Sequence, residues 1–143
     1  MRVEDILRDK GTNVATTSPD ANISSALAML RDRGIGALMV ATATNPVSGI
    51  LSERDIVRAL AERGPSVLSE SVGTNMTSPV ISCTPAELLT DAMSTMTTKR
   101  FRHMPVVDGG ELVGIVSIGD LVKHRLDELE YEASNLRAYI ATA

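Results

Sequence analysis

The feature that most restricts the fold of this chain is an internal duplication. The segment GILSERDIV begins at Gly49 and the segment GIVSIGDLV begins at Gly114, so the same order of glycine, apolar residues, serine and aspartate occurs twice. The aspartates of the two segments, Asp55 and Asp120, are 65 residues apart (120 − 55). Further upstream, SPDANISSALAML and TPAELLTDAMSTM also align, at an offset one residue larger. Two repeated segments at a nearly constant offset indicate two copies of one folding unit.

Each copy predicts the same order of elements. A helix is expected after Ser18-Pro19 or Thr84-Pro85, where a hydroxyl cap precedes a proline at the first helical position. A short apolar run then predicts a buried strand, which is followed by a turn and a second strand. The Ser-x-x-Asp segment begins another helix. The predicted strands are 37–41, 47–51, 104–107 and 112–116, and the closing helices are 55–62 and the segment from 120 onward.

We therefore expect an α/β (α+β) fold in which two tandem repeats pack sheet against sheet with pseudo-two-fold symmetry. One unit alone would leave a face of its sheet uncovered, so the units should occur as a pair. We place repeat 1 at residues 1–66, repeat 2 at residues 67–126 and a C-terminal amphipathic helix extension at residues 127–143. The stretch 64–77 is rich in serine and glycine, and we interpret it as a short linker within one module.

The last helix has a pattern of its own. Its apolar residues are spaced alternately by four and three, as in the seam of a coiled coil. One interpretation is a long helix that lies on its own module. The seam is longer than a repeat needs, so we favour pairing with the same helix of a second subunit, which makes the protein a homodimer. The seam residues are Val122, Leu126, Leu129, Ala133, Leu136 and Ile140.

Composition argues against several classes of function. The formal net charge is −4 and aromatic residues make up 2%, which is unfavourable for binding a nucleic-acid backbone or stacking on bases. Cys83 is the single cysteine, and we expect a small buried side chain and not a reactive thiol. The first residues are charged and no apolar run is long enough to span a membrane, so the cytoplasm is the expected compartment.

The candidate site residues are Ser52 with Asp55 and Ser117 with Asp120. A serine followed three residues later by an acid is also a capping box, so one interpretation is purely structural. In the other, free helix amides and the hydroxyl bind phosphate, while the aspartate accepts ribose hydroxyls. The glycine that begins each segment would let a flat base approach the backbone. On this second interpretation the residues form a nucleotide pocket without catalytic groups.

The doubled pattern resembles a pair of cystathionine-β-synthase-type (CBS) domains, the Bateman module. The resemblance rests on GILSERD and GIVSIGD, with HMPVVD before the second, and covers about residues 3–126. The C-terminal helix, through NLRAYI, is similar to small stand-alone bacterial CBS-pair proteins. The resemblance implies a regulatory module that binds AMP, ATP or NAD(H) between the repeats and signals to a partner protein. From the residues themselves we expect no catalytic cofactor, metal, nucleic acid or membrane as a partner.

The resemblance also implies which residues contact the ligand. Asp55 and Asp120 would hold ribose hydroxyls, and Ser52 and Ser117 would contact phosphate. Apolar residues would flank adenine, and basic residues after Lys99 would neutralise phosphate, the alternatives being a solvated charged loop and a packed histidine. The remaining predicted ligand-binding residues are Val14, Ala37, Val80, Met104, Pro105, Arg54, Arg100, Arg102 and His103.

The two copies differ where the first has Gly34-Ile35-Gly36 and the second has Arg100-Phe101-Arg102. The two sites should therefore not be equivalent, and the cationic one suits a multiply charged ligand. We expect Phe101 in the core and not over a base.

The alternative function is a protein-interaction scaffold with vestigial clefts. An enzyme is disfavoured because the sequence offers no nucleophile, metal cluster, GxGxxG motif or P-loop.

Overall fold

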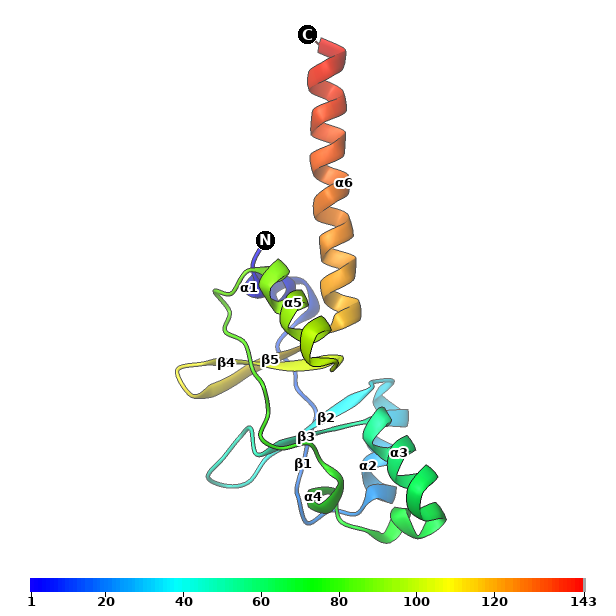
Figure 1. Ribbon diagram of the computed structural model, residues 1–143. Coiled ribbons are helices and arrows are strands. Elements are labelled where there is room, and N and C mark those ends of the chain that lie inside the picture. The colour runs from blue at the N-terminus through cyan, green and yellow to red at the C-terminus, as the bar shows by residue number, and fades with distance from the viewer. Residues whose placement is uncertain (143) are drawn as a thin grey trace.

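The computed structural model describes residues 1–142, and its two halves lie one above the other (Figure 1). The first half contains β1 (Thr16–Thr17), α2 (Ile23–Arg33), β2 (Ala37–Val40), β3 (Gly49–Ser52) and α3 (Glu53–Arg63). The second contains α5 (Leu89–Lys99), β4 (His103–Asp108), β5 (Glu111–Ser117) and the start of α6 (Ile118–Thr142). The predicted order of helix, strand, strand and helix is confirmed in both copies. The remaining elements are α1 (Val3–Lys10), the 3-10 helix η1 (Gly64–Ser69) and α4 (Val72–Asn75).

Each half has its own small sheet. In the first, β1 pairs with β2 in parallel and β2 pairs with β3 antiparallel, with Ala37 opposite Ser52. In the second, β4 and β5 form an antiparallel pair with His103 opposite Ser117. Because side chains alternate across a strand, one face of each sheet meets its own helices and the other face is left over.

The leftover sheet faces pack against each other, as the repeat predicted. Met39 and Ile50 are buried between the halves, where Ile115 of the second sheet packs against their cluster. Leu38 and Leu51 point the other way, into the core that the first half forms with its helices. The cluster between the halves consists of Ala37, Met39 and Ile50 together with Val14, Val47, Val80, Leu112 and Ile115.

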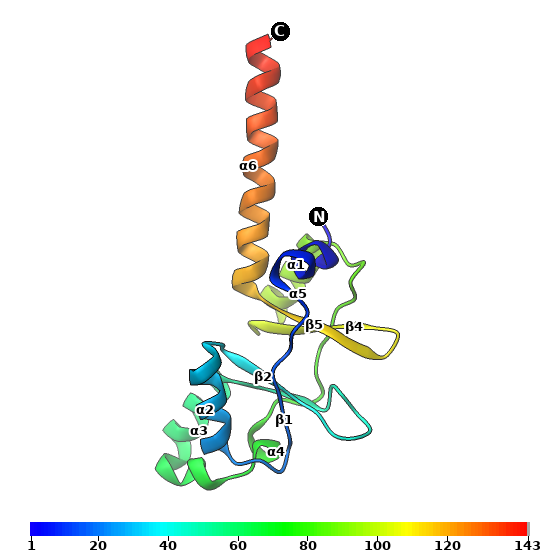
Figure 2. The same cartoon turned by 180° about the vertical axis from the view of Figure 1, so that it is seen from behind.

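The short helix that precedes each copy packs on the opposite copy. Helix α1 belongs to the core of the second half, where Val3 and Ile6 are fully buried, and it lies beside α5 in both views (Figures 1 and 2). Helix α4 lies between the two copies in sequence and packs in the first half, where Val72 is fully buried. The chain therefore crosses between the halves twice, and neither half has its complete core without a segment from beyond its own repeat.

Two glycines make this crossing possible. A Cβ atom at Gly114 would lie 2.6 Å from Leu7 Cδ2, and a Cβ atom at Gly49 would lie 2.3 Å from Met76 Sδ. The space above each glycine is therefore filled by the exchanged segment. Our interpretation that these glycines admit a flat base is wrong, because side chains of the protein occupy that space.

The helix starts differ from those expected. Helices α2 and α5 begin at Ile23 and Leu89, four residues after the prolines that we placed at the first helical position. Ser18 instead begins a turn in which its carbonyl accepts a hydrogen bond from Ala21 N at 3.2 Å. The cap of α2 is Asn22, whose side chain accepts from Ser25 N. An asparagine closer to the apolar face outcompetes the earlier serine as the cap.

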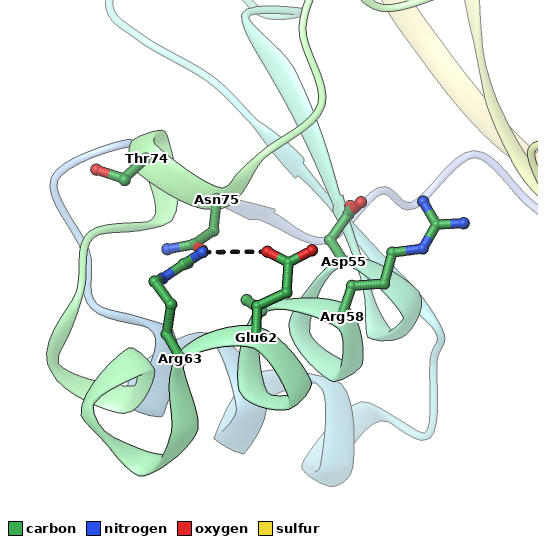
Figure 3. A pocket seen from close by; sticks show the side chains of 7 residues that line it. Asp55, Arg58, Glu62, Arg63, Thr74 and Asn75 are labelled. Atoms are coloured by element: carbon green, nitrogen blue, oxygen red, sulfur yellow. Dashed lines mark hydrogen bonds and ion pairs between the residues drawn. The ribbon is translucent and has the colours of Figure 1, made fainter.

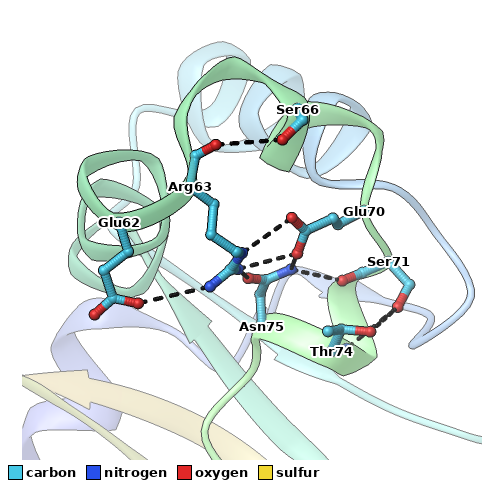
Figure 4. A network of polar contacts seen from close by, with 7 residues as sticks. All are labelled: Glu62, Arg63, Ser66, Glu70, Ser71, Thr74 and Asn75. Atoms are coloured by element: carbon cyan, nitrogen blue, oxygen red, sulfur yellow. Dashed lines mark hydrogen bonds and ion pairs between the residues drawn. The ribbon is translucent and has the colours of Figure 1, made fainter.

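The segment 64–77 is a packed part of the first half. It forms η1 and α4, and both Val67 and Val72 are fully buried. A polar network anchors it to α3: Arg63 Nη2 donates to Glu70 Oε1 at 3.0 Å and to Asn75 Oδ1 at 2.6 Å (Figure 4). The expectation of a simple linker is therefore wrong, because apolar residues hidden among its serines and glycines complete the core.

The packing of α1 on β5 leads to a prediction about stability. Gly114→Ala should destabilise the protein by about 1–3 kcal/mol, because the new methyl group overlaps Leu7. In a Leu7→Ala background, which itself costs about 2–5 kcal/mol, the same change should cost much less, because the overlapping carbon is gone. Urea unfolding of the four proteins measures this coupling. Equal costs in both backgrounds would contradict the packing of α1 on β5.

Candidate functional site

The Ser-x-x-Asp segments form capping boxes in both copies. Asp55 N donates to Ser52 Oγ at 3.2 Å, and Ser52 N donates to Asp55 Oδ2 at 2.9 Å. Asp120 N donates to Ser117 Oγ at 3.1 Å, and Ser117 N donates to Asp120 Oδ2 at 2.9 Å. The predicted capping-box geometry is therefore confirmed in both copies. A carboxylate has about four acceptor positions, so the capping role leaves capacity for a ligand.

Asp55 lies at the edge of a cleft of about 570 Å³ between the two halves. Its second oxygen, Oδ1, accepts from Thr77 Oγ1 at 3.2 Å, and both residues line the cleft. Val57 and Ile81 are exposed apolar residues that line it. The apolar part of the lining consists of Ile50, Val57, Pro79, Val80, Ile81 and Phe101.

The cleft is strongly cationic although the chain is acidic. Five basic side chains line it against the two carboxylates of Glu53 and Asp55. The basic residues come from both halves of the protein. They are Arg54 and Arg58 of α3 with Lys99, Arg100 and Arg102 of the second half.

Asp120 has a different environment and does not line this cleft. Lys10 Nζ, at the end of α1, donates to Asp120 Oδ2 at 2.5 Å and to the carbonyl oxygen of Ile115 at 2.9 Å. Burial alone would raise the pKa of Asp120, but the hydrogen bonds from Lys10 and Ser117 outweigh it and lower that pKa. The second carboxylate is thus paired with a cation from the protein itself.

His103 packs against the first copy. Its Nε2 would be 3.1 Å from a Cβ atom at Gly36, so the missing side chain of Gly36 makes room for the imidazole ring. Burial, together with the nearby charge of Lys10, lowers the pKa of His103, although Glu53 and Asp120 act in the opposite direction. The ring is therefore neutral at pH 7, which favours the packed-histidine interpretation over a phosphate-binding cation.

Arg100 is held in a left-handed backbone conformation. It ends α5 with φ 60° and ψ 48°, and Gly34 ends α2 in nearly the same conformation, φ 62° and ψ 40°. A side chain in this region costs free energy that glycine does not. The second copy therefore keeps an unfavourable arginine at a position lining the cleft, where the first copy has the conformationally suited residue.

A smaller hollow of about 200 Å³ adjoins the cleft along α3 and shares Asp55 and Arg58 with it (Figure 3). Its far end is formed by Arg63 and Asn75, which belong to the network that anchors the segment after α3. Hydrogen bonds from Arg63 and then Asn75 lower the pKa of Glu70, so this network is ionised at neutral pH. The network fixes the helix that presents Asp55 and Arg58.

The predicted site residues divide into three groups. Ser52, Arg54, Asp55, Val80, Arg100, Arg102 and His103 line the cleft. Ser117 and Asp120 lie together at the start of α6, with Lys10. The others are packed: Ala37 is buried between the sheets with Val14 against it, Met104 is buried in the core of the second half, and Pro105 is buried within β4.

Sequence reasoning missed several residues of the site. Arg58 follows Arg54 by four residues on α3, so helical spacing was a signal that it shares the same face. Thr77 and Lys10 had no such signal, because only the crossing of the chain brings them to Asp55 and Asp120. Phe101 packs against the second core and also lines the cleft. Cys83 is buried, as expected, and burial raises the pKa of its thiol to about 12.

Comparison with known families identifies both repeats. Residues 3–62 and 70–127 each match the CBS domain. The chain belongs to the CBS domain family. It is a tandem CBS pair followed by the remainder of α6, so the resemblance inferred from the repeated motifs is confirmed.

Proteins with a similar sequence or structure come from several organisms. A CBS-domain protein of Agrobacterium tumefaciens has a similar structure, with a TM-score of 0.85 and 43% identity over 87% of this chain and 99% of that one. A mitochondrial CBS domain-containing protein of Arabidopsis thaliana is 32% identical, covering 96% of this chain and 71% of that protein. A CBS domain protein of Pyrobaculum aerophilum complexed with AMP has a TM-score of 0.78 and 29% identity over 93% of this chain and 99% of that one. The family by itself does not assign a compartment.

Within residues 1–142, no three histidine, cysteine, aspartate or glutamate side chains gather closely enough to hold a metal ion. Over the same residues, every helix is too short or too polar to cross a membrane.

The conformation of Arg100 makes a testable prediction. Arg100→Gly should stabilise the protein by about 1 kcal/mol, because glycine relieves the left-handed backbone. Gly34→Ala is the matched control and should destabilise by about 1 kcal/mol, because a Cβ there meets open space and only the backbone conformation is penalised. Thermal unfolding of both variants measures the effect. A destabilised Arg100→Gly protein would show that the arginine side chain contributes more than its backbone costs.

The Lys10–Asp120 pair predicts a pH dependence. Lys10→Met should destabilise the protein by about 0.5–1 kcal/mol at pH 7, since the pair is partly exposed. Because the native pKa of Asp120 is lowered, the contribution of the ion pair is complete above the unfolded value of about 3.9 and disappears as pH falls through the native pKa. The hydrogen bond from Lys10 to Ile115 does not titrate, so the difference between the two proteins should shrink toward acid pH. Unfolding of both proteins by urea from neutral to acid pH measures the difference, and a difference of unchanged size at the acid end would refute the assignment.

Proposed function

We propose that this CBS pair is a regulatory module that binds an adenine nucleotide in the Asp55 cleft and signals its presence to a partner protein. The observation that supports this most is one cleft that combines a carboxylate, apolar walls and an excess of cations. Its volume of about 570 Å³ is typical of small-molecule sites. The AMP complex of the Pyrobaculum aerophilum relative supports the choice of an adenine nucleotide.

Each part of such a ligand has a suitable receiver in the cleft. The purine lies against Val80 and Ile81, whose exposed surface it covers. The ribose hydroxyls donate to Asp55 Oδ1, in place of the hydroxyl of Thr77 that now occupies this oxygen. The phosphates lie toward Arg100 and Arg102, and guanidinium groups bind phosphate oxygens in pairs.

The surplus of cations bears on how many phosphates the ligand has. A nucleoside monophosphate can satisfy only part of a cluster of five basic side chains. A diphosphate, a triphosphate or a dinucleotide such as NAD(H) spreads its charge over more of them. We therefore expect ATP to bind more tightly than AMP, and AMP more tightly than adenosine, with differences that shrink as salt is added.

The cleft at Asp55 is the main binding site in this proposal. The corresponding carboxylate of the second copy, Asp120, is already neutralised by Lys10, and a ribose would have to displace that amine. The inequality of the two sites follows from the pairing of Lys10 and from the different residues at 34–36 and 100–102. The ligand acts as a regulatory signal and not as a catalytic cofactor, so the module is not an enzyme.

Signalling requires a second component. We propose that the module works as a homodimer, and that the partner protein distinguishes its ligand-bound and ligand-free forms. The alternative is an interaction scaffold that uses no ligand, and the exposed apolar stripe of α6 is the observation in its favour. The two functions differ in one measurable property, because a ligand that binds only the native state must raise its stability.

The proposal predicts the effect of two matched variants. Asp55→Asn should weaken ATP binding at least about 10-fold, because the amide loses one charged acceptor of the ribose. Asp120→Asn removes the same charge from an equivalent capping box and should change ATP affinity by less than about 2-fold. Isothermal titration calorimetry of both variants and the wild type measures the three affinities.

Each of the two variants alters one of the two capping boxes, so a general loss of stability would affect both and not only Asp55→Asn. If ATP, AMP and NADH at millimolar concentration all leave the melting temperature unchanged, the scaffold function is correct and the nucleotide proposal is wrong. If Asp120→Asn proves to be the damaging variant, the ligand binds beside Asp120 and not in the Asp55 cleft.

A further inference from the structure

Helix α6 leaves the body of the protein with an apolar stripe uncovered. Leu121 and His124 are buried against the body, whereas every residue from Leu129 to Thr142 is exposed. Figures 1 and 2 show the helix projecting well beyond both halves. Within the described chain, its last four turns therefore have no packing of their own, and most helical stability in proteins comes from packing.

The stripe faces away from the body. At about 100° per residue, Val122, Leu126 and Leu129 lie roughly a third of a turn from the buried face of Leu121 and His124. The large members of the stripe are all between 40% and 65% exposed. The body thus leaves the whole stripe open to a partner, including the part beside α5. This excludes the interpretation that α6 covers its own module with this face.

The sequence assigns heptad positions to the stripe. Leu126, Ala133 and Ile140 occupy a positions, and Val122, Leu129 and Leu136 occupy d positions. A β-branched residue at a together with leucine at d favours two strands, and Leu136 with Ile140 has this combination. The flanking positions are charged apart from Tyr139 at g: Arg125 and Glu132 are the other g residues, and Lys123, Glu130 and Arg137 are at e.

These charges distinguish the two possible directions of a pair of identical helices. In a parallel pair, a g residue faces the e residue five positions later in the other helix. Arg125 then faces Glu130 of the partner subunit, and Glu132 faces Arg137 of the partner subunit, so both contacts are attractive. An antiparallel pair with full overlap brings Glu130 against its own copy, Glu132 against its own copy, and Lys123 against Arg137. All three of these contacts are repulsive.

We propose that α6 binds α6 of a second copy as a parallel, in-register two-stranded coiled coil. The Arg125–Glu130 and Glu132–Arg137 contacts between subunits fix its direction and register. This inference rests on the homodimer of the proposed function and specifies its geometry, and it is independent of the nucleotide. Arg125 also contacts Glu128 of its own helix, so the Glu132–Arg137 contact is the better one to test.

Single cysteines test the direction. Leu136→Cys should form a covalent dimer on mild oxidation, because position 136 meets itself only in the parallel pair. In the antiparallel pair it faces Leu126, so only a mixture of Leu126→Cys and Leu136→Cys proteins would cross-link. Tyr131→Cys, exposed and away from the stripe, is the matched control and should stay monomeric on a non-reducing gel. The native Cys83 is buried and should not contribute.

Charge exchange tests the register. Glu132→Lys should raise the dimer dissociation constant about 5- to 20-fold, because the new lysine of each subunit then faces Arg137 of the partner subunit. The repulsion therefore occurs twice in the symmetric dimer. Adding Arg137→Glu should restore it to within about 3-fold, since the attraction returns with reversed sign. Sedimentation equilibrium of the wild type and both variants measures the constants.

The outcomes separate this inference from the proposals it rests on. A dimeric wild type in which Leu136→Cys fails to cross-link, or a double variant as weak as Glu132→Lys, overturns the parallel register and leaves the homodimer standing. A wild type that is monomeric at all concentrations overturns both. Nucleotide affinity, measured separately by calorimetry, decides the ligand proposal by itself.

Discussion

The exchange of the short helices α1 and α4 between the two halves is the constraint on which the rest of the structure depends. Leu7 fills the space above Gly114 and Met76 fills the space above Gly49, so each sheet is locked to a segment that precedes the other copy. The same exchange delivers Lys10 to Asp120 and Thr77 to Asp55. The exchange thus completes the two cores, and it also decides which of two equivalent carboxylates is left beside an open cleft.

The local architecture was predictable because it depends on residues close together in the sequence. The duplicated motifs predicted both helix–strand–strand–helix units, and the unpaired apolar faces predicted their packing, as Met39 and Ile50 show. The helix starts were misplaced because Ser18 and Asn22 are both competent caps, and only the packing of Ile23 selects the later one. The roles of Lys10 and Met76 could not be predicted, since each acts on the half that follows or precedes its own repeat.

The capping boxes show why a local motif does not decide a binding function. Asp55 and Asp120 make the same hydrogen bonds to Ser52 and Ser117, so their immediate geometry is one structural solution used twice. Their difference lies in the third neighbour, which is a neutral hydroxyl for Asp55 and an ammonium group for Asp120. In the proposed function, a ribose would have to displace a single weak hydrogen bond in the first case and a charge-assisted pair in the second.

The site and α6 are joined by a direct connection through the second half. Arg102 lines the cleft, and its carbonyl oxygen accepts a hydrogen bond at 2.8 Å from the backbone N–H of Ile118, the first residue of α6. In the first copy, the carbonyl of Gly36 holds Glu53 N at 2.9 Å in the same way, but α3 ends on its own half. A ligand shifts a conformational equilibrium only by its difference in affinity for the two states. In the proposed function, the cations Arg100 and Arg102 are therefore the part of the site through which such a difference would reach the helix that leaves the body.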